Sequence, residues 1–241
     1  KTLKKDPNSL HVIHYSCETF YGKPDSFSPT IVAVAVRKYL GGQTTTFSLA
    51  EKREELIYKG NQNPDIKQVE LEMLNDLFRF FRQNMNSLFV HWNMRSSQYG
   101  FKAIEHRYRI LGGQPISLPE NNLYDLADIF RAIYEKGYIE DPKLESLAKK
   151  NELGMRHFMA GGAEADAFDQ GMFSDIKLST IKKVEIISYL LEYKLQAKLK
   201  TNARFNLVEF IKDIPNNPFY IILSLFAIFG TFYGLYIAFF P

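Results

Sequence analysis

Short apolar runs alternate with polar connections in the first half of the chain, and longer helical patterns dominate the second half. Four runs rich in Val, Ile, Thr or aromatic residues predict β-strands, at residues 10–15, 30–39, 44–49 and 87–92. The first three follow one another closely, with a glycine pair at 41–42 as a turn signal. We therefore expect these three strands to form an antiparallel meander.

Apolar residues recur every three or four positions between about residues 68 and 84, which predicts an amphipathic helix. Its broad apolar face contains Val69, Leu71, Leu74, Leu77, Phe78 and Phe81. Further helical patterns lie near 97–111, 123–136, 143–151, 160–171 and 178–200. The pattern predicts an α/β domain with a mixed sheet and flanking helices. Three adjacent strands, a helix, a fourth strand and then helices is the order of a ribonuclease-H-like fold.

The C-terminal part of the chain is strongly apolar, with no charged residue after Asp213. Residues 219–241 would extend for ~34 Å as a helix, which matches the ~30 Å hydrocarbon core of a bilayer. A buried core helix is the alternative, but such helices usually carry a polar stripe or are shorter. The segment therefore predicts a C-terminal transmembrane helix.

Lysines outnumber acidic residues just before this apolar segment, in the stretch between Lys177 and Lys212. By the positive-inside rule, this excess places the preceding domain in the cytoplasm and the chain in the inner membrane. Residues 205–214 form either a short interfacial helix or a plain linker helix, ended by Pro215 and Pro218. We expect a domain at 1–175, a basic helical linker at 176–217 and a membrane helix at 218–241.

Gly230 and Gly234 stand four residues apart within the apolar segment. Small residues at this spacing let two membrane helices approach closely, so the pair is a candidate face for self-association. The motif is also common by chance in membrane helices.

Composition narrows the possible chemistry. The chain has 241 residues, a net charge of +3 and one cysteine. A single cysteine excludes an intramolecular disulfide and any multi-cysteine zinc or iron–sulfur site. A thiol pair of Cys17 with His14 or His91 is conceivable, although a cysteine at a strand end is more often packed. The length suits one domain with an appendage.

Several local motifs occur in a specific order between Leu10 and Phe173. The first strand ends in Ser16-Cys17-Glu18-Thr19, and FVHWNMRSSQYGF at 89–101 follows the fourth strand. Asn122-Leu123-Tyr124-Asp125-Leu126 lies at the start of the predicted helix near 123–136, and His157 precedes Asp166-Ala167 in the stretch AEADAFD. In this order and spacing the chain resembles the DEDDh family of 3′–5′ exonucleases, which has a ribonuclease-H-like fold.

The resemblance implies a site in which four carboxylates hold two divalent metal ions and a histidine activates the attacking water. Here Ser16 replaces the first Asp, and Ser96, Ser97 or Tyr99 stands where the Asp of the second motif belongs. The matching positions that remain are Glu18, His157 and Asp166. With two of four carboxylates missing, we expect no two-metal site and no cofactor, and we assign no catalytic residue. Mg²⁺ enters only if the exonuclease alternative holds.

Basic and aromatic residues after the second motif are candidates for contacts with nucleic acid or with a protein partner: Trp92, Arg95, Tyr99, Lys102, Arg107 and Arg109. The alternative is a solvated helix face with two core aromatic residues, since basic residues are commonest on exposed faces.

Three functions are consistent with these observations. The first is a membrane-acting effector, a toxin, whose degenerate nuclease domain docks on a partner; this architecture resembles membrane effectors of bacterial anti-phage systems, including retrons. That resemblance implies a reverse transcriptase with its DNA–RNA hybrid as partner and the lipid bilayer as target. The second is a membrane-tethered, metal-dependent 3′–5′ exonuclease. The third is a non-enzymatic membrane tether.

Overall fold

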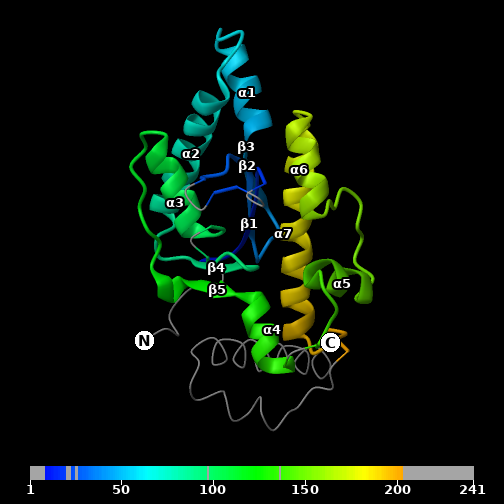
Figure 1. The fold of residues 1–241 in the computed structure, drawn as a ribbon. Helices are drawn as coiled ribbons and strands as arrows, with labels where there is room; N and C mark the ends of the chain where they lie inside the picture. Colours follow the sequence, from blue (N-terminus) through cyan, green and yellow to red (C-terminus); the bar gives the residue numbers. More distant parts are fainter. Residues whose placement is uncertain (1–8, 20–22, 25–26, 97, 136, 203–241) are drawn as a thin grey trace, which may run out of the picture.

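A computed structural model of the chain describes residues 9–19, 23–24, 27–96, 98–135 and 137–202 (Figure 1). The predicted transmembrane helix, its Gly230/Gly234 pair and the segment at 205–214 lie outside these residues. Within the described ranges, no helix combines the length and the hydropathy that crossing a membrane requires.

Five strands form one mixed sheet in the order β3-β2-β1-β4-β5. They are β1 (Leu10–Cys17), β2 (Ile31–Lys38), β3 (Thr44–Ser48), β4 (Leu88–His91) and β5 (Leu123–Asp125). Strands β1, β2 and β3 pair antiparallel, whereas β4 pairs parallel with β1, and β5 with β4. The predicted α/β class and antiparallel meander are confirmed.

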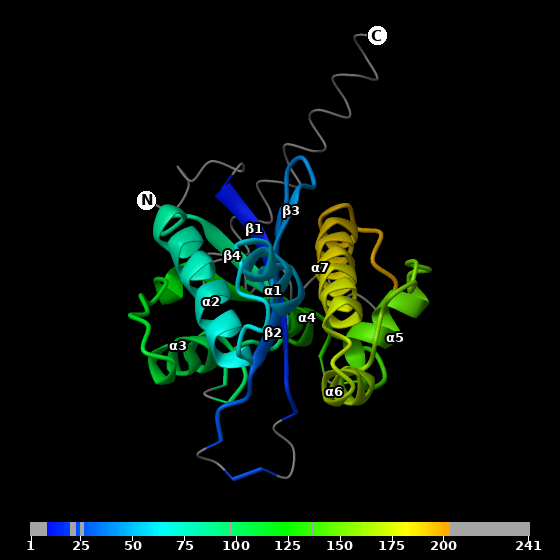
Figure 2. The same ribbon diagram turned by 90° about the horizontal axis from the view of Figure 1, so that it is seen from above.

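Helices cover both faces of the sheet (Figures 1 and 2). Their bounds are α1 (Leu49–Tyr58), α2 (Ile66–Gln83), α3 (Phe101–Ile110), α4 (Leu126–Tyr134), α5 (Lys143–Lys150), α6 (Gly161–Asp169) and α7 (Phe173–Leu195), with a 3₁₀ turn at Glu120–Asn122. Helices α2 and α3 pack on one face, and α4, α5 and α7 pack on the other. Alternation along β1 produces this division: Ile13 and Tyr15 point toward α2, while Val12 points toward α7.

Helix α7 differs from the expectation of a basic linker after residue 175. Its apolar residues Ile176, Val184, Ile187 and Leu190 are buried, and the helix packs along β2 and β1. Residues 173–195 therefore belong to the domain core. The lysines between these apolar positions led to the prediction of a linker, because basic residues are usually exposed.

Two elements were not predicted from the sequence. Helix α1 buries only Leu49, so it lacks the apolar stripe that reveals a helix. It is started instead by Ser48, whose hydroxyl accepts a hydrogen bond from the Glu51 backbone N–H. Strand β5 is three residues long and runs directly into α4, where Asp125 caps the helix by accepting from the Ala127 N–H. The pattern at 123–136 therefore contains a strand and a helix.

Candidate functional site at the end of strand β1

The candidate site lies where β1 ends, beside helices α6 and α7. Ser16 points to the face that α7 covers, and its side chain is 2% exposed. The pairing of β1 with β2 is irregular between Ser16 and Cys17, so the strand ends here with a local change in register. The sequence resemblance predicts a carboxylate position here, and side chains from α6 and α7 contact Ser16 in the structure.

A buried polar cluster forms around one oxygen of Glu164, which lies on α6. Ser16 Oγ donates to Glu164 Oε1 at 3.0 Å, and Ser179 Oγ donates to the same atom at 2.6 Å. Lys183 Nζ lies 2.7 Å from it, and the Thr180 hydroxyl donates to Ser16 Oγ at 2.8 Å. All five side chains are buried. We refer to these residues as the Ser16–Lys183 cluster.

The Ser16–Lys183 cluster gives the buried Glu164 carboxylate a counter-charge and hydrogen bonds. Burying a carboxylate is costly unless an opposite charge and hydrogen bonds accompany it. Glu164 has both, because Lys183 supplies the charge and two hydroxyls donate to the oxygen that the ammonium contacts. The ammonium also lies 5.6 Å from the centre of the Phe158 ring. The ion pair joins α6 and α7 behind the end of β1.

Glu18, the second carboxylate of the first motif, is bound to the start of β2. Its Oε2 accepts from the Thr30 hydroxyl at 3.0 Å and from the Thr30 backbone N–H at 3.3 Å. The Glu18 N–H in turn donates to the Thr30 carbonyl at 2.9 Å. The side chain thus closes the connection between β1 and β2.

The second motif is held to β1 by tyrosines. Tyr99 stacks on Tyr15 with ring centres 4.5 Å apart, and its hydroxyl donates to the Tyr15 carbonyl at 2.8 Å. The Tyr15 hydroxyl accepts from the Gly100 N–H at 2.9 Å. Gly100 has φ +154°, and a Cβ there would lie 2.4 Å from the Met94 carbonyl oxygen. The Ser96 hydroxyl is engaged in the same turn, and residue 97 lies outside the described ranges.

The remaining exonuclease positions are not brought together. His157 is exposed in the turn after α5, with φ +68°. Asp166 is exposed on α6, while Glu164 and Ala167 form the buried face of that helix. Residues two positions apart are separated by about 200° around the helix axis. Only one of the two acidic side chains can therefore face β1. The sequence motif predicted Asp166 as the acidic residue beside β1. The packing of α6 places Glu164 there instead.

The Cys17 thiol is not activated. Burial, and then the negative charges of Glu164 and Glu18, raise the pKa of this thiol to about 12. Burial lowers the pKa of His14 well below its usual value, and the positive charge of Lys183 adds to this. A neutral thiol and a neutral imidazole are therefore the forms present near pH 7, which disfavours a thiolate nucleophile.

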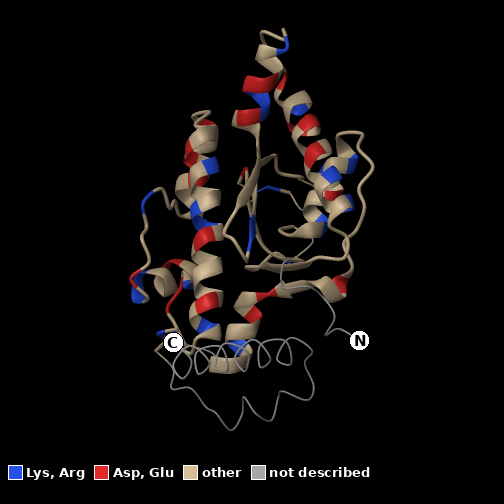
Figure 3. Cartoon of the chain, turned by 180° about the vertical axis from the view of Figure 1, so that it is seen from behind, with Lys and Arg blue, Asp and Glu red and all other residues tan. Residues whose placement is uncertain are grey.

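The six candidate nucleic-acid contacts do not all lie on one surface, although Arg95 and Lys102 line the same pocket. Trp92 is 5% exposed and packs edge-on against Phe130 in the core. Arg107 makes two hydrogen bonds to the buried Glu70, at 2.9 and 2.6 Å, so its guanidinium is internal. Arg95 forms ion pairs with Asp125 and Asp128, and Tyr99 packs on β1 as described. Lys102 and Arg109 are exposed on α3. Basic and acidic residues are interspersed over the visible helices (Figure 3).

The residues at the end of β1 do not fit the two divalent metal ions that the exonuclease resemblance implies. Hard cations need several anionic oxygen ligands at one point. Here Ser16 offers a hydroxyl, Glu18 is bonded to Thr30, and Glu164 is paired with Lys183. In the described part of the chain no three His, Cys, Asp or Glu residues are grouped to hold a metal. The Lys183 ammonium is the cation next to Glu164.

A pH effect follows from the buried His91 at the end of β4. Its pKa is lowered to about 3, mainly by burial and then by the charge of Arg95, and its Nδ1 accepts from the Met94 N–H. Below about pH 6.5 the unfolded chain binds a proton here that the folded chain does not, so stability falls as the pH drops toward 3. We expect His91→Gln to flatten this dependence by up to about 1.4 kcal/mol per pH unit.

Urea unfolding followed by Trp92 fluorescence at several pH values measures this slope. Above about pH 7 the two proteins should have parallel profiles, since His91 is neutral in both the folded and the unfolded state. Identical slopes in the acid range would contradict the assignment of a neutral buried imidazole.

Comparison with known proteins gives little additional guidance. No model of a known protein family matches the sequence, and no match is found among curated proteins. Among solved structures, the chain is similar to the family B DNA polymerase from the hyperthermophilic archaeon Pyrobaculum calidifontis, with a TM-score of 0.49 and 14% identity. The match covers 77% of this chain and 25% of the polymerase chain. A likeness at this level says nothing about the activity of this chain.

Proposed function

We propose that the chain is a membrane-acting effector whose N-terminal part is a non-catalytic domain with a ribonuclease-H-like fold. The sheet order β3-β2-β1-β4-β5, with three antiparallel strands followed by two parallel ones, supports this fold. The order of motifs from Leu10 to Phe173 supports descent from a DEDDh-type exonuclease. The apolar segment at 219–241 supplies the membrane part of the proposal.

The observation that carries the non-catalytic assignment is the ion pair between Lys183 and Glu164. In a two-metal nuclease the carboxylates at this place bind the cations that position and activate the water. In this chain Glu164 reaches the end of β1 from α6 and already has an ammonium partner at 2.7 Å, Glu18 is hydrogen-bonded to Thr30, and Ser16 contributes no charge. Loss of metal ligands at such a site removes orders of magnitude in rate.

A domain that no longer cleaves can still bind a partner and control what is attached to it. We propose that it docks on a nucleoprotein, such as a reverse transcriptase with its DNA–RNA hybrid, and keeps the membrane segment inactive. Release of the domain then allows the segments to associate through Gly230 and Gly234 and to permeabilise the inner membrane. The basic excess before the segment supports a cytoplasmic location for the domain.

Membrane potential in bacteria that express the chain tests this function. We expect the full chain and Glu18→Ala to depolarise the membrane, and a chain ending at Asp213 to leave it polarised. Gly230→Leu/Gly234→Leu should reduce the effect, whereas Ser224→Leu/Thr231→Leu adds bulk at two positions away from the face that the two glycines would share in a helix and should not. Glu18-dependent loss of nucleic acid without depolarisation would favour the exonuclease alternative. Full activity with an unrelated anchor in place of 215–241 would favour the tether.

A further inference from the structure

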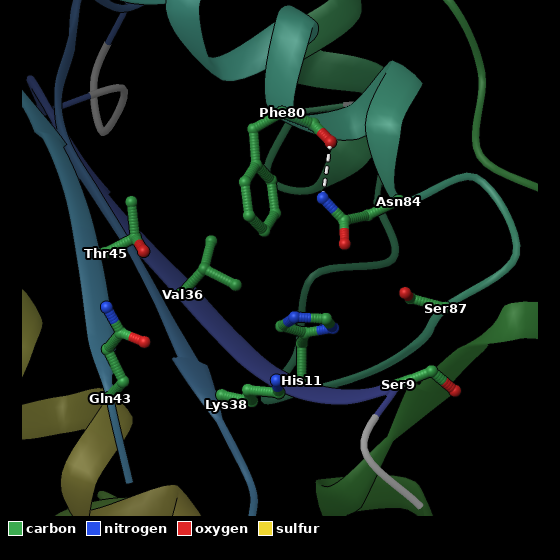
Figure 4. A pocket seen from close by; sticks show the side chains of 9 residues that line it. All are labelled: Ser9, His11, Val36, Lys38, Gln43, Thr45, Phe80, Asn84 and Ser87. Carbon is green, nitrogen blue, oxygen red and sulfur yellow. Dashed lines mark hydrogen bonds between the residues drawn. The ribbon is translucent and has the colours of Figure 1, made fainter. Parts of the chain in front are cut away.

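A small polar pocket lies at the other end of β1, between the sheet and the C-terminal end of α2 (Figure 4). Its volume is about 280 Å³, and strands β1, β2 and β3 line one side while α2 lines another. Typical ligand pockets begin at roughly 300 Å³, so this one suits a single small ring system with a substituent. It is separate from the Ser16–Lys183 cluster, because Ser16 is near the opposite end of the same strand.

His11 forms the floor of the pocket and is 7% exposed. Its ring stacks on Phe89, with centres 5.4 Å apart, and meets the edge of Phe80 at 5.7 Å. The Nδ1 atom is buried, and the Ser9 backbone lies close to the imidazole. Burial lowers the pKa of this imidazole more than the nearby Ser9 backbone raises it, and the charge of Lys38 lowers it further. A neutral imidazole offers one donor and one acceptor.

The walls add amide and hydroxyl groups around this floor. The side-chain nitrogen of Asn84 donates to the Phe80 carbonyl at 2.9 Å, which leaves its oxygen directed toward the pocket (Figure 4). Gln43 brings a second amide from the opposite wall, and the Ser87 hydroxyl lies beside the floor. Amide groups can donate and accept at once, so two of them can match a ring edge that carries both kinds of group.

Charge at the rim restricts the ligand further. Lys38 is the charged side chain among the described residues that line the pocket, and none of these residues is acidic. An ammonium at the mouth favours a neutral ligand or one with an anionic substituent and disfavours a cation. The half-buried Phe80 ring gives an aromatic wall against which a flat ring can pack.

We propose that this pocket binds a nucleoside or a nucleoside monophosphate, with the base inside the pocket and any phosphate near Lys38. A nucleobase is flat, is of suitable size, and carries hydrogen-bond donors and acceptors along one edge. The amides of Gln43 and Asn84 supply complementary groups, and the imidazole of His11 supplies a flat, polar floor. The proposal does not depend on the membrane function, since the pocket lies wholly within the described domain.

Isothermal titration calorimetry of the full chain in lipid nanodiscs tests the proposal by measuring the heat of ligand binding. The probes are the four common ribonucleosides, their 5′-monophosphates and inorganic phosphate alone. We expect at least one nucleoside to bind, its monophosphate to bind more tightly, and inorganic phosphate not to bind. His11→Phe keeps the stacked ring but removes its nitrogens, and we expect it to weaken binding about tenfold. Gln43→Met changes an exposed residue without disturbing the core and should also weaken binding.

Lys38→Gln separates the base from the phosphate. It should remove the advantage of the monophosphate and leave nucleoside binding unchanged, whereas Lys67→Gln on the exposed start of α2 should change neither. Thermal melting confirms that each variant is folded. The proposal is overturned if no nucleoside binds at up to about 5 mM, if inorganic phosphate binds as well as the monophosphates, or if folded His11→Phe and Gln43→Met bind like the unaltered chain.

Discussion

Replacing Lys183 by methionine is expected to lower the free energy of unfolding by about 3 kcal/mol. The substitution keeps the length and apolar stem of the side chain but removes the ammonium next to Glu164. The carboxylate is then buried without a counter-charge, with Ser16 and Ser179 as its hydrogen-bond donors. Breaking a buried pair from one side costs more than the pair itself contributes, because the remaining charge stays desolvated.

Urea unfolding followed by the single tryptophan, Trp92, measures this change, since the residue lies in the core. Lys177→Met on the same helix is the matched control: Lys177 forms a partly exposed pair with Glu51 at 3.4 Å, and its loss should cost less than about 1 kcal/mol. Adding Glu164→Gln to Lys183→Met should recover part of the lost stability. Equal effects of the two lysine substitutions would show that Lys183 and Glu164 are not a buried pair.

Replacing Arg107 by methionine is expected to lower the free energy of unfolding by about 4 kcal/mol. Glu70 is 0% exposed, accepts two hydrogen bonds from Arg107, and accepts a third from the Ile31 backbone N–H at 2.7 Å. The guanidinium also donates to the Ser28 carbonyl at 2.8 Å. One side chain thus joins α3, α2 and the start of β2, and methionine would leave both Glu70 and that carbonyl without it.

The defect in Arg107→Met should shrink at low pH. Burial raises the pKa of Glu70 even with the arginine present. Without the guanidinium the carboxyl should take up a proton more readily still, and a neutral acid is less costly to bury than an anion. The loss of stability should therefore be smaller at about pH 5 than at about pH 8.

Arg109→Met on the same helix is the control for the Arg107 prediction. Arg109 is exposed, so its replacement should change stability by less than about 0.5 kcal/mol. If Arg107→Met were as mild as Arg109→Met and also weakened binding of a nucleic acid, Arg107 would belong to an external contact surface after all.

Much of the fold was accessible from the sequence because it depends on strong local patterns. The apolar runs predicted β1 to β4, and the periodicity of α2 predicted most of its buried face, with Leu71 partly buried at its border. The pattern failed where elements carry few apolar residues or are very short. Helix α1 buries one residue, and β5 has three residues, so neither had a period to detect.

The candidate site was harder to predict because its members come from distant parts of the chain. Ser16 stands where the exonuclease resemblance places a carboxylate, and its hydrogen-bond partner Glu164 lies 148 residues away. The choice between Glu164 and Asp166 depends on which face of α6 packs inward, and a nine-residue helix with small residues does not reveal this locally. Lys183 directly follows Lys182 in a lysine-rich stretch, a pattern that is typical of a solvated surface. Its burial depends on the docking of α7 against β1 and β2.

Arg107 was a candidate for an exposed contact, but in the structure its guanidinium is internal. A cluster of basic residues on one helix favoured a nucleic-acid contact, and the acidic partner on α2 could not be seen in the local sequence. Glu70 stands among the apolar residues of the buried α2 face, between Val69 and Met73. An acidic residue at such a position is the signal that a buried counter-charge exists elsewhere in the chain.

Manganese binding by the full chain tests the central claim, that the end of β1 holds an ion pair in place of metal ions. Electron paramagnetic resonance counts free Mn²⁺ during a titration and needs no substrate. We expect no site tighter than about 1 mM, and the same titration curve for Glu164→Gln and Glu18→Ala. A Mn²⁺ site with a dissociation constant well below about 1 mM, lost in both variants, would contradict the account. It would favour the metal-dependent exonuclease alternative.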